Sequence, residues 1–174
     1  MENGILFSER QSFKQWWIWI ILLAIDGLFL YGSYKQLFLE EPFGNKPMND
    51  TGLILMTSLA IILTLLFIFL RLDTKIKKDG IYVRFFPFHL SYKHYPWDSL
   101  RECYIRKYSP ITEYGGWGVR LGLFGKGKAF NVSGGKGLQL EFTNQKKILI
   151  GTGKSDEMAK VLKEIGQLKR QQKS

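Results

Sequence analysis

Cysteine is almost absent from this sequence. Of 174 residues only Cys103 carries a thiol, and only His89 and His94 carry an imidazole. A single cysteine excludes an intramolecular disulfide and the Cys-rich zinc motifs, and it agrees with a reducing compartment. Because no catalytic or metal-ligand spacing links these three residues, we expect surface or loop histidines, no nucleophilic Cys–His pair, and neither a metal nor another cofactor.

Acidic residues are also scarce, but only in the second part of the chain. Up to Leu70 four Lys and Arg oppose six Asp and Glu; from Arg71 onward twenty-one oppose nine, for a total net charge of +10. Such a charge predicts an anionic partner, either nucleic acid or the acidic lipids of a cytoplasmic leaflet. A basic domain tethered at a membrane needs no nucleic acid to explain it, so none is expected.

Charge is nearly missing from two runs of nineteen residues, 16–34 and 52–70, where Asp26 is the one charged side chain. At 1.5 Å per helical residue, each run matches the thickness of a hydrocarbon core. We therefore expect residues 1–71 to contain a transmembrane hairpin of two helices. A signal peptide is the alternative for the first run, and the central Asp26 and the lack of a cleavage site disfavour it.

The flanks of this hairpin predict its orientation. The connector, 35–51, holds two lysines against three acidic residues, whereas the outer flanks are basic at Arg10, Lys14, Arg71, Lys75, Lys77 and Lys78. By the positive-inside rule both termini face the cytoplasm, in a multi-pass protein of the cytoplasmic membrane.

Asp26 has two interpretations. Ionisable residues inside membranes often line ion paths, which would make the chain a subunit of a larger transport complex. The structural alternative is a protonated carboxyl, or one hydrogen-bonded to Thr57, Ser58 or Thr64. A donor in a second copy of the chain would serve equally, and it would make a homo-oligomer through the helices.

After Arg71 the hydrophobic period changes from helical to two, which predicts strands. Asp79-Gly80 is a hairpin turn signal, and Pro96 is expected at a strand end or bulge. Further strands are expected at 100–108, 116–124, 129–133, 138–143 and 146–150, about seven in an antiparallel meander. Ser155 is the expected N-cap of a final helix, whose apolar stripe comprises Met158, Val161, Leu162, Ile165 and Leu168.

These residues resemble a known family. The early hairpin, the segment 95–100 (YPWDSL), the strand 137–142 (GLQLEF), the strand ending at 148–152 (ILIGT) and the final helix are similar to bacterial membrane-anchored PH-like (pleckstrin-homology-like) domain proteins. The resemblance implies an α+β fold: a transmembrane hairpin, then a cytoplasmic domain at 72–174 in which an antiparallel PH-like β-barrel is capped by one C-terminal helix. It implies no particular ligand or activity.

The segment 151–155 (GTGKS) invites comparison with a phosphate-binding loop, because it follows a strand and precedes a helix. The motif needs a glycine five positions before Gly153, where this chain has Ile148. We therefore expect a loop that caps the helix.

The candidate contacts with a ligand or membrane are basic or lie in glycine-rich segments. Trp117 and Arg120 fall in the run 114–120 (YGGWGVR), which is either a structural turn or a binding site, with Asp98 or Glu113 as partners for Arg120. The remaining candidates are Lys75, Lys77, Lys78, Arg84, Lys126, Lys128 and Lys136.

No catalytic motif accompanies these residues. We therefore expect a membrane-anchored binding or scaffolding module that contacts the bilayer, acidic headgroups or a membrane protein. The alternatives are the transport subunit above and a membrane enzyme whose site lies near Trp117 and Arg120.

Overall fold

The computed structural model describes residues 4–122 and 125–168. The chain divides into two compact units. One is a helical hairpin, Lys14–Phe69, and the other is a strand domain that joins the residues up to Phe13 with those from Leu70 onward.

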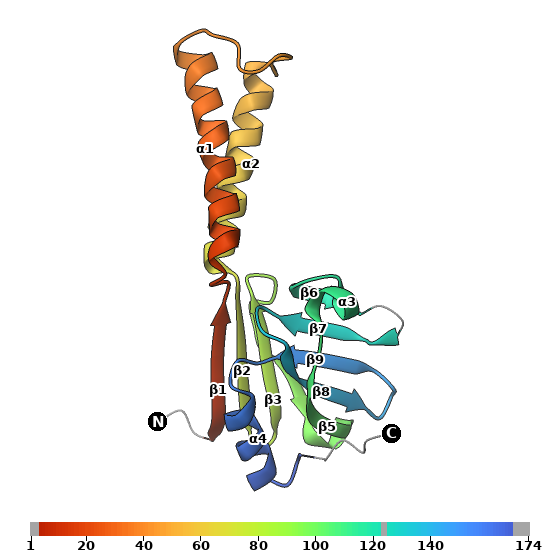
Figure 1. The fold of residues 1–174 in the computed structure, drawn as a ribbon. Coiled ribbons are helices and arrows are strands. Elements are labelled where there is room, and N and C mark those ends of the chain that lie inside the picture. Colours follow the sequence, from red (N-terminus) through yellow and green to blue (C-terminus); the bar gives the residue numbers. More distant parts are fainter. Residues whose placement is uncertain (1–3, 123–124, 169–174) are drawn as a thin grey trace. The chain divides into compact units, whose positions relative to one another are not determined.

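The two apolar runs form helices α1 (Trp16–Phe38) and α2 (Asp50–Phe69), as predicted to within a turn (Figure 1). Both are long and apolar enough to cross a membrane, and only 11% and 17% of their most apolar windows are buried. A core helix of a soluble protein would be mostly buried. Most of the apolar surface of both helices is therefore not covered by other parts of the described chain.

Small and polar residues join the two helices. The Ser33 and Thr57 hydroxyls lie 2.8 Å apart, and Phe43 of the connector packs where a Cβ on Gly32 would stand. Asp26 makes no hydrogen bond to Thr57, Ser58 or Thr64 within the described chain, and its Oδ1 atom is buried. The expected bond within the hairpin is thus not formed.

The first sheet is antiparallel, with strand order β1-β2-β3-β4. Its strands are β1 (Ile5–Ser12), β2 (Arg71–Lys77), β3 (Gly80–Phe86) and β4 (Lys93–Pro96). The predicted hairpin is present, but Lys77 pairs with Gly80, so its two turn residues are Lys78 and Asp79. Gly80 is required for another reason, because a Cβ there would collide with the backbone oxygen of Tyr95.

Strand β1 was not predicted. Residues 1–71 were expected to comprise an N-terminal segment and the transmembrane hairpin, whereas part of that segment forms β1, which pairs with β2 from Ile5↔Lys77 to Ser12↔Arg71. The hairpin of α1 and α2 is consequently an insertion between two adjacent strands of one sheet.

The second sheet has the order β5-β8-β9-β7-β6. Its strands are β5 (Leu100–Lys107), β6 (Gly118–Leu121), β7 (Lys128–Asn131), β8 (Lys136–Phe142) and β9 (Lys147–Gly151). The predicted antiparallel meander is wrong in two respects, because β7 and β9 are parallel and because β5 pairs with β8 rather than with a strand next to it in sequence. The strand expected at 116–124 begins only at Gly118 and ends at Leu121, and residues 123–124 of that prediction lie outside the described residues.

Three short helices complete the strand domain: η1 (Trp97–Ser99), α3 (Pro110–Tyr114) and α4 (Ser155–Glu164). On α4 the predicted stripe places Met158 and Leu162 in the core, both fully buried, and the helix ends before Ile165. Ser155 is the first helical residue rather than the N-cap, which is Lys154.

Alternating side chains build a core on one face of each sheet. On the first sheet these include Leu72, Ile76, Ile81, Val83 and Phe85, and on the second Phe130, Leu138, Leu140 and Ile150. Tyr95 of β4 meets Phe142 of β8 with ring centroids 5.6 Å apart, so the sheets are in contact. The architecture is mixed α+β as expected, but the described strands form two sheets and no closed barrel.

Candidate functional site

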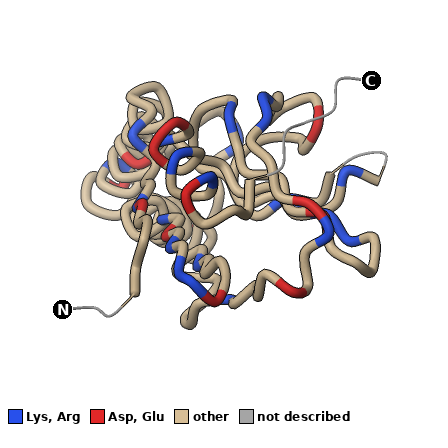
Figure 2. The backbone as a smooth tube through the Cα atoms, turned by 90° about the horizontal axis from the view of Figure 1, so that it is seen from below, with Lys and Arg blue, Asp and Glu red and all other residues tan. Residues whose placement is uncertain are grey.

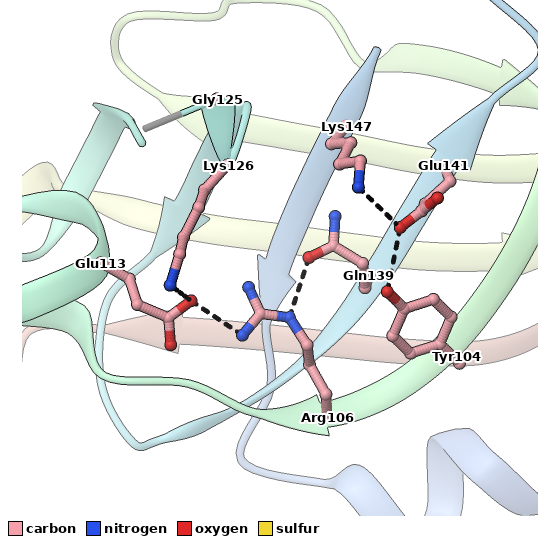
Figure 3. Close-up of a pocket in the computed structure, with 8 residues that line it drawn as sticks. All are labelled: Tyr104, Arg106, Glu113, Gly125, Lys126, Gln139, Glu141 and Lys147. Atoms are coloured by element: carbon pink, nitrogen blue, oxygen red, sulfur yellow. Dashed lines mark hydrogen bonds and ion pairs between the residues drawn. The ribbon is translucent and has the colours of Figure 1, made fainter. Parts of the chain in front are cut away.

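A polar pocket lies on the face of the second sheet opposite the core (Figure 3). It has a cavity volume of about 270 Å³. Its lining residues come from β5, β8, β9, α3 and the β6–β7 loop: Tyr104, Arg106, Glu113, Gly125, Lys126, Gln139, Glu141 and Lys147. Alternation along the strands places them there, because residues two apart share a sheet face.

Arg106 is the centre of the first half of the pocket. Its Nε donates to Gln139 Oε1 at 3.0 Å and its Nη1 to Glu113 Oε2 at 2.9 Å. Lys126 Nζ lies 3.1 Å from the same Glu113 oxygen, so two cations converge on one carboxylate (Figure 3). Helix α3 fixes this carboxylate, since Glu113 Oε1 also accepts from the Ser109 backbone N–H at 3.0 Å.

Glu141 is the centre of the second half. Its Oε1 accepts from the Tyr104 hydroxyl at 3.0 Å and lies 3.2 Å from Lys147 Nζ. Arg101 Nη2 donates to the other oxygen at 2.6 Å.

The two carboxylates are held in the charged state. Burial alone would raise the pKa of each, but the Ser109 N–H, Lys126 and Arg106 together lower the pKa of Glu113. The cations and Tyr104 do the same for Glu141. Conversely, burial and the bond to Glu141 raise the pKa of Tyr104 to about 12. Four cations therefore oppose two carboxylates, and the excess positive charge suits an anionic group.

A second cluster of the same kind lies on the outer face of the first sheet. Arg10, Arg71 and Arg84 surround Asp73, whose side chain is 4% exposed. Burial would raise the pKa of Asp73, but hydrogen bonds from Arg84 and Arg10 lower it.

The nine basic and glycine-segment candidates do not form one site. Lys75, Lys77 and Arg84 share the outer face of the first sheet, and Lys78 is in its β2–β3 turn. Lys126 lines the pocket, Lys128 lies over the Phe130 ring, and Lys136 contacts Ser155. Figure 2 agrees, since Lys and Arg are spread along the chain among Asp and Glu.

The glycine-rich segment is held by the chain itself. Gly115 ends α3 in the left-handed conformation, with φ of 69°. Arg120 Nε donates to Trp117 O at 2.8 Å, so its bond is to neither predicted acid, Asp98 nor Glu113. The side chain of Asn131, which sequence analysis missed, accepts from Gly118 N at 2.9 Å. These contacts favour the structural interpretation of the segment.

The loop at 151–155 holds a carboxylate of this chain. Glu9 of β1 accepts from the Thr152 hydroxyl at 2.5 Å and from the Gly153 N–H at 2.8 Å. Gln11 donates to Gly151 O at 2.8 Å. The loop therefore joins β1 to the start of α4, but the helix cap expected of it is not formed, because the N-cap residue Lys154 makes no side-chain capping hydrogen bond.

The rare thiol and imidazoles do not form a reactive group in the described part of the chain. Burial raises the pKa of Cys103 to about 12. His89 Nδ1 accepts from the Phe85 N–H, and His94 stacks on Tyr82 with centroids 4.3 Å apart. No set of three potential metal ligands occurs among the described residues.

Comparison with known proteins gives a family. A search of curated proteins found no match. A family model matches residues 1–117, which span both apolar helices, the first sheet, β5 and α3. Because this match covers more than half of the chain, the protein belongs to that family, a family of unknown function (DUF6141).

Proposed function

We propose that this protein is a membrane-anchored binding module whose strand domain is held at the cytoplasmic face, with both termini in the cytoplasm. One observation carries the proposal: the apolar hairpin is inserted between the paired strands β1 and β2. Only residues 13–15 separate β1 from α1, and only Leu70 separates α2 from β2. Two such short links keep the domain within a few residues of the bilayer.

The position of β1 also argues against a cleaved signal sequence at α1. Cleavage after α1 would remove β1, with the bonds from Glu9 to Thr152 and Gly153. It would also leave the edge of β2 that pairs with β1 without a hydrogen-bonded neighbour.

The two sheets and the final amphipathic helix support a relationship to PH-like domains, here with sheets that the described strands do not close into a barrel. The parallel pair β7 and β9 departs from the antiparallel expectation. The excess of cations over carboxylates around the pocket supports an anionic group, on a lipid or a partner protein, as the ligand.

Orientation is tested by cysteine labelling in intact cells. Asn45→Cys in the connector is expected to react with a membrane-impermeant maleimide, and Lys146→Cys in the β8–β9 turn only after permeabilisation. Native Cys103 stays in place, because a buried thiol with a pKa of about 12 presents almost no thiolate. Labelling of both positions from the same side would refute the anchoring.

Binding is tested with the full chain in nanodiscs mixed with vesicles that contain phosphatidylglycerol, and by pull-down from membrane extracts. Replacing Lys126, Lys128 and Lys136 by Gln is expected to weaken binding at least about tenfold, since each such charge contributes on the order of 1 kcal/mol. The control variant carries Gln in place of three other exposed lysines, Lys146, Lys160 and Lys163. Equal binding by both variants in both assays would contradict the proposal.

A second candidate, a subunit of a larger membrane assembly, rests on Asp26. The Asp26 carboxyl makes no hydrogen bond within the described chain, and the residue is only half-buried, so a donor from another chain could reach it. Asp26→Asn and Asp26→Leu would alter the mass of the assembly in mild detergent if this candidate is right. An unchanged mass would remove its support.

A further inference from the structure

Three arginines converge on one carboxylate at one end of the first sheet. Arg10 Nε lies 2.9 Å from Asp73 Oδ1, while Arg84 Nη2 and Arg71 Nε lie 2.7 and 3.4 Å from Oδ2. The strand register explains the convergence, because Arg10 and Arg84 are the cross-strand partners of Asp73. We call these four residues the arginine cluster, and its formal charge is +2.

Aromatic rings hold two of the guanidinium groups in place. Arg71 lies over Phe86 at 4.8 Å and Arg84 over Tyr92 at 4.6 Å from the ring centroids. Each guanidinium has five N–H donors in a fixed plane, and one carboxylate accepts only a few of them. The remaining donors are therefore available to phosphate oxygens, which guanidinium groups bind well.

The cluster lies where the chain passes between the sheet and the apolar helices. Arg71 follows Leu70 directly, and it pairs with Ser12 on one side and Phe86 on the other. The β3–β4 loop begins after Phe86, at this same end of the sheet (Figure 1).

That loop exposes two large apolar side chains. Phe88 is 64% exposed and Leu90 is 77% exposed, although both belong to the strand domain. His89 between them is fixed, because its backbone N–H donates to Phe85 O at 2.8 Å and its ring meets Phe130. A loop that is fixed by these contacts and presents apolar side chains beside cations is suited to a membrane interface.

The opposite end of the sheet is less suitable. Lys77 and Lys78 stand at the far end of β2, six and seven residues after Arg71 and thus about 20 Å from it along the strand. Exposed charges separated by that distance are largely screened from one another at physiological salt, where the Debye length is about 8 Å, so these lysines add little to the field around Arg71.

We propose that the arginine cluster and the β3–β4 loop form a second membrane contact. Phe88 and Leu90 enter the interface of the bilayer that holds the hairpin, and the arginines bind the phosphates of acidic phospholipids. This inference rests on the proposed anchoring, and it assigns the lipid-facing part of the domain.

The loop is tested on the full chain in nanodiscs, with an environment-sensitive fluorophore on Phe88→Cys, Leu90→Cys or Lys78→Cys. At positions 88 and 90 we expect blue-shifted emission and strong quenching by lipids that carry a headgroup-level spin label. At Lys78, at the other end of the same sheet, we expect neither. Identical, water-like spectra at all three positions would overturn the proposal.

The arginine cluster is tested by lipid preference. Spin-labelled phosphatidylglycerol should quench the probe at position 88 about threefold more efficiently than spin-labelled phosphatidylcholine. Arg10→Gln with Arg71→Gln, which keeps the Arg84–Asp73 pair, should abolish this ratio while the blue shift remains. Lys77→Gln with Lys78→Gln removes the same charge and should leave the ratio unchanged; the reverse result would assign lipid binding to the turn.

Failure of this inference differs from failure of the anchoring. If Asn45→Cys and Lys146→Cys label from opposite sides but the probes at 88 and 90 report water, the anchor is present and the loop contact is wrong. Labelling of both cysteines from one side would instead remove the anchor.

Discussion

Single polar residues at core positions decide where β1 lies. Glu9 and Gln11 occupy inward-facing positions where the alternating pattern calls for apolar side chains, and both are buried. Their partners, Gly151, Thr152 and Gly153, follow about 140 residues later. Burial of Glu9 and of the Gln11 amide nitrogen is tolerated because hydrogen bonds replace those lost to water, whereas Gln11 Oε1 has no hydrogen-bond partner within the described chain.

Glu9→Ala should therefore destabilise the strand domain. The substitution leaves the Thr152 hydroxyl and the Gly153 N–H without their acceptor, at a cost of about 2 kcal/mol in the free energy of unfolding. Chemical denaturation of the detergent-solubilised chain measures this loss. Ser8→Ala, on the exposed face of the same strand, is the control, and equal stability of the two variants would show that the Glu9 contacts contribute nothing.

Glu9 and Gln11 also illustrate which elements could be predicted from the sequence and which could not. Both helices, the β2–β3 hairpin and most strands of the second sheet follow from long runs or clean alternation. Strand β1 could not be found, because its inward-facing Glu9 and Gln11 break the apolar alternation. The pocket could not be predicted either, because only the pairing of β5 with β8 and the packing of α3 bring Arg106, Glu113 and Glu141 into one lining. Lys126 was singled out, but its partner Glu113 was named only as a possible partner for Arg120.

At the scale of elements, glycine decides where α3 ends. The predicted strand at 116–124 starts late, at Gly118, because Pro110 begins a helix and Gly115 stops it. Gly115 N–H donates to Ile111 O at 2.8 Å with φ of 69°, a conformation that costs a residue with a Cβ. Helix α3 in turn positions Glu113 in the pocket.

Gly115→Ala should strain this cap. A Cβ at Gly115 meets no atom within 4 Å, so the cost is conformational, about 1 kcal/mol in the free energy of unfolding. Gly115→Asn should recover part of the loss, because asparagine tolerates the left-handed region. Thermal denaturation of the three proteins measures the order Gly, Asn, Ala; an alanine variant as stable as the parent would contradict this account of the cap.

At the scale of the whole molecule, the positive charge is organised around a few carboxylates. Asp73 is shared by three arginines, Glu113 by Arg106 and Lys126, and Glu141 by Arg101 and Lys147. Each cluster carries more cations than anions, so the outer faces of the two sheets present fixed cations. Such a design suits a domain that meets acidic surfaces.

These carboxylates also make the fold sensitive to acid. In the folded chain the pKa values of Asp73, Glu113 and Glu141 lie below their ordinary values. As pH falls below about 5, the unfolded chain therefore binds more protons than the folded chain, and the free energy of unfolding decreases. The stabilisation is complete above the ordinary carboxyl pKa of about 4 and is lost as pH passes through the lowered values.

Asp73→Asn separates this effect from general acid denaturation. The variant should be less stable by about 2 kcal/mol at pH 7, because three arginines lose their shared anion, and its stability should fall less steeply between pH 5 and pH 3. Denaturant titrations at several pH values measure both the loss and the slope. Asp98→Asn, at an exposed residue of η1, is the control and should keep the parent slope. If the Asp73 variant also keeps that slope, the acid sensitivity belongs to the two pocket carboxylates alone.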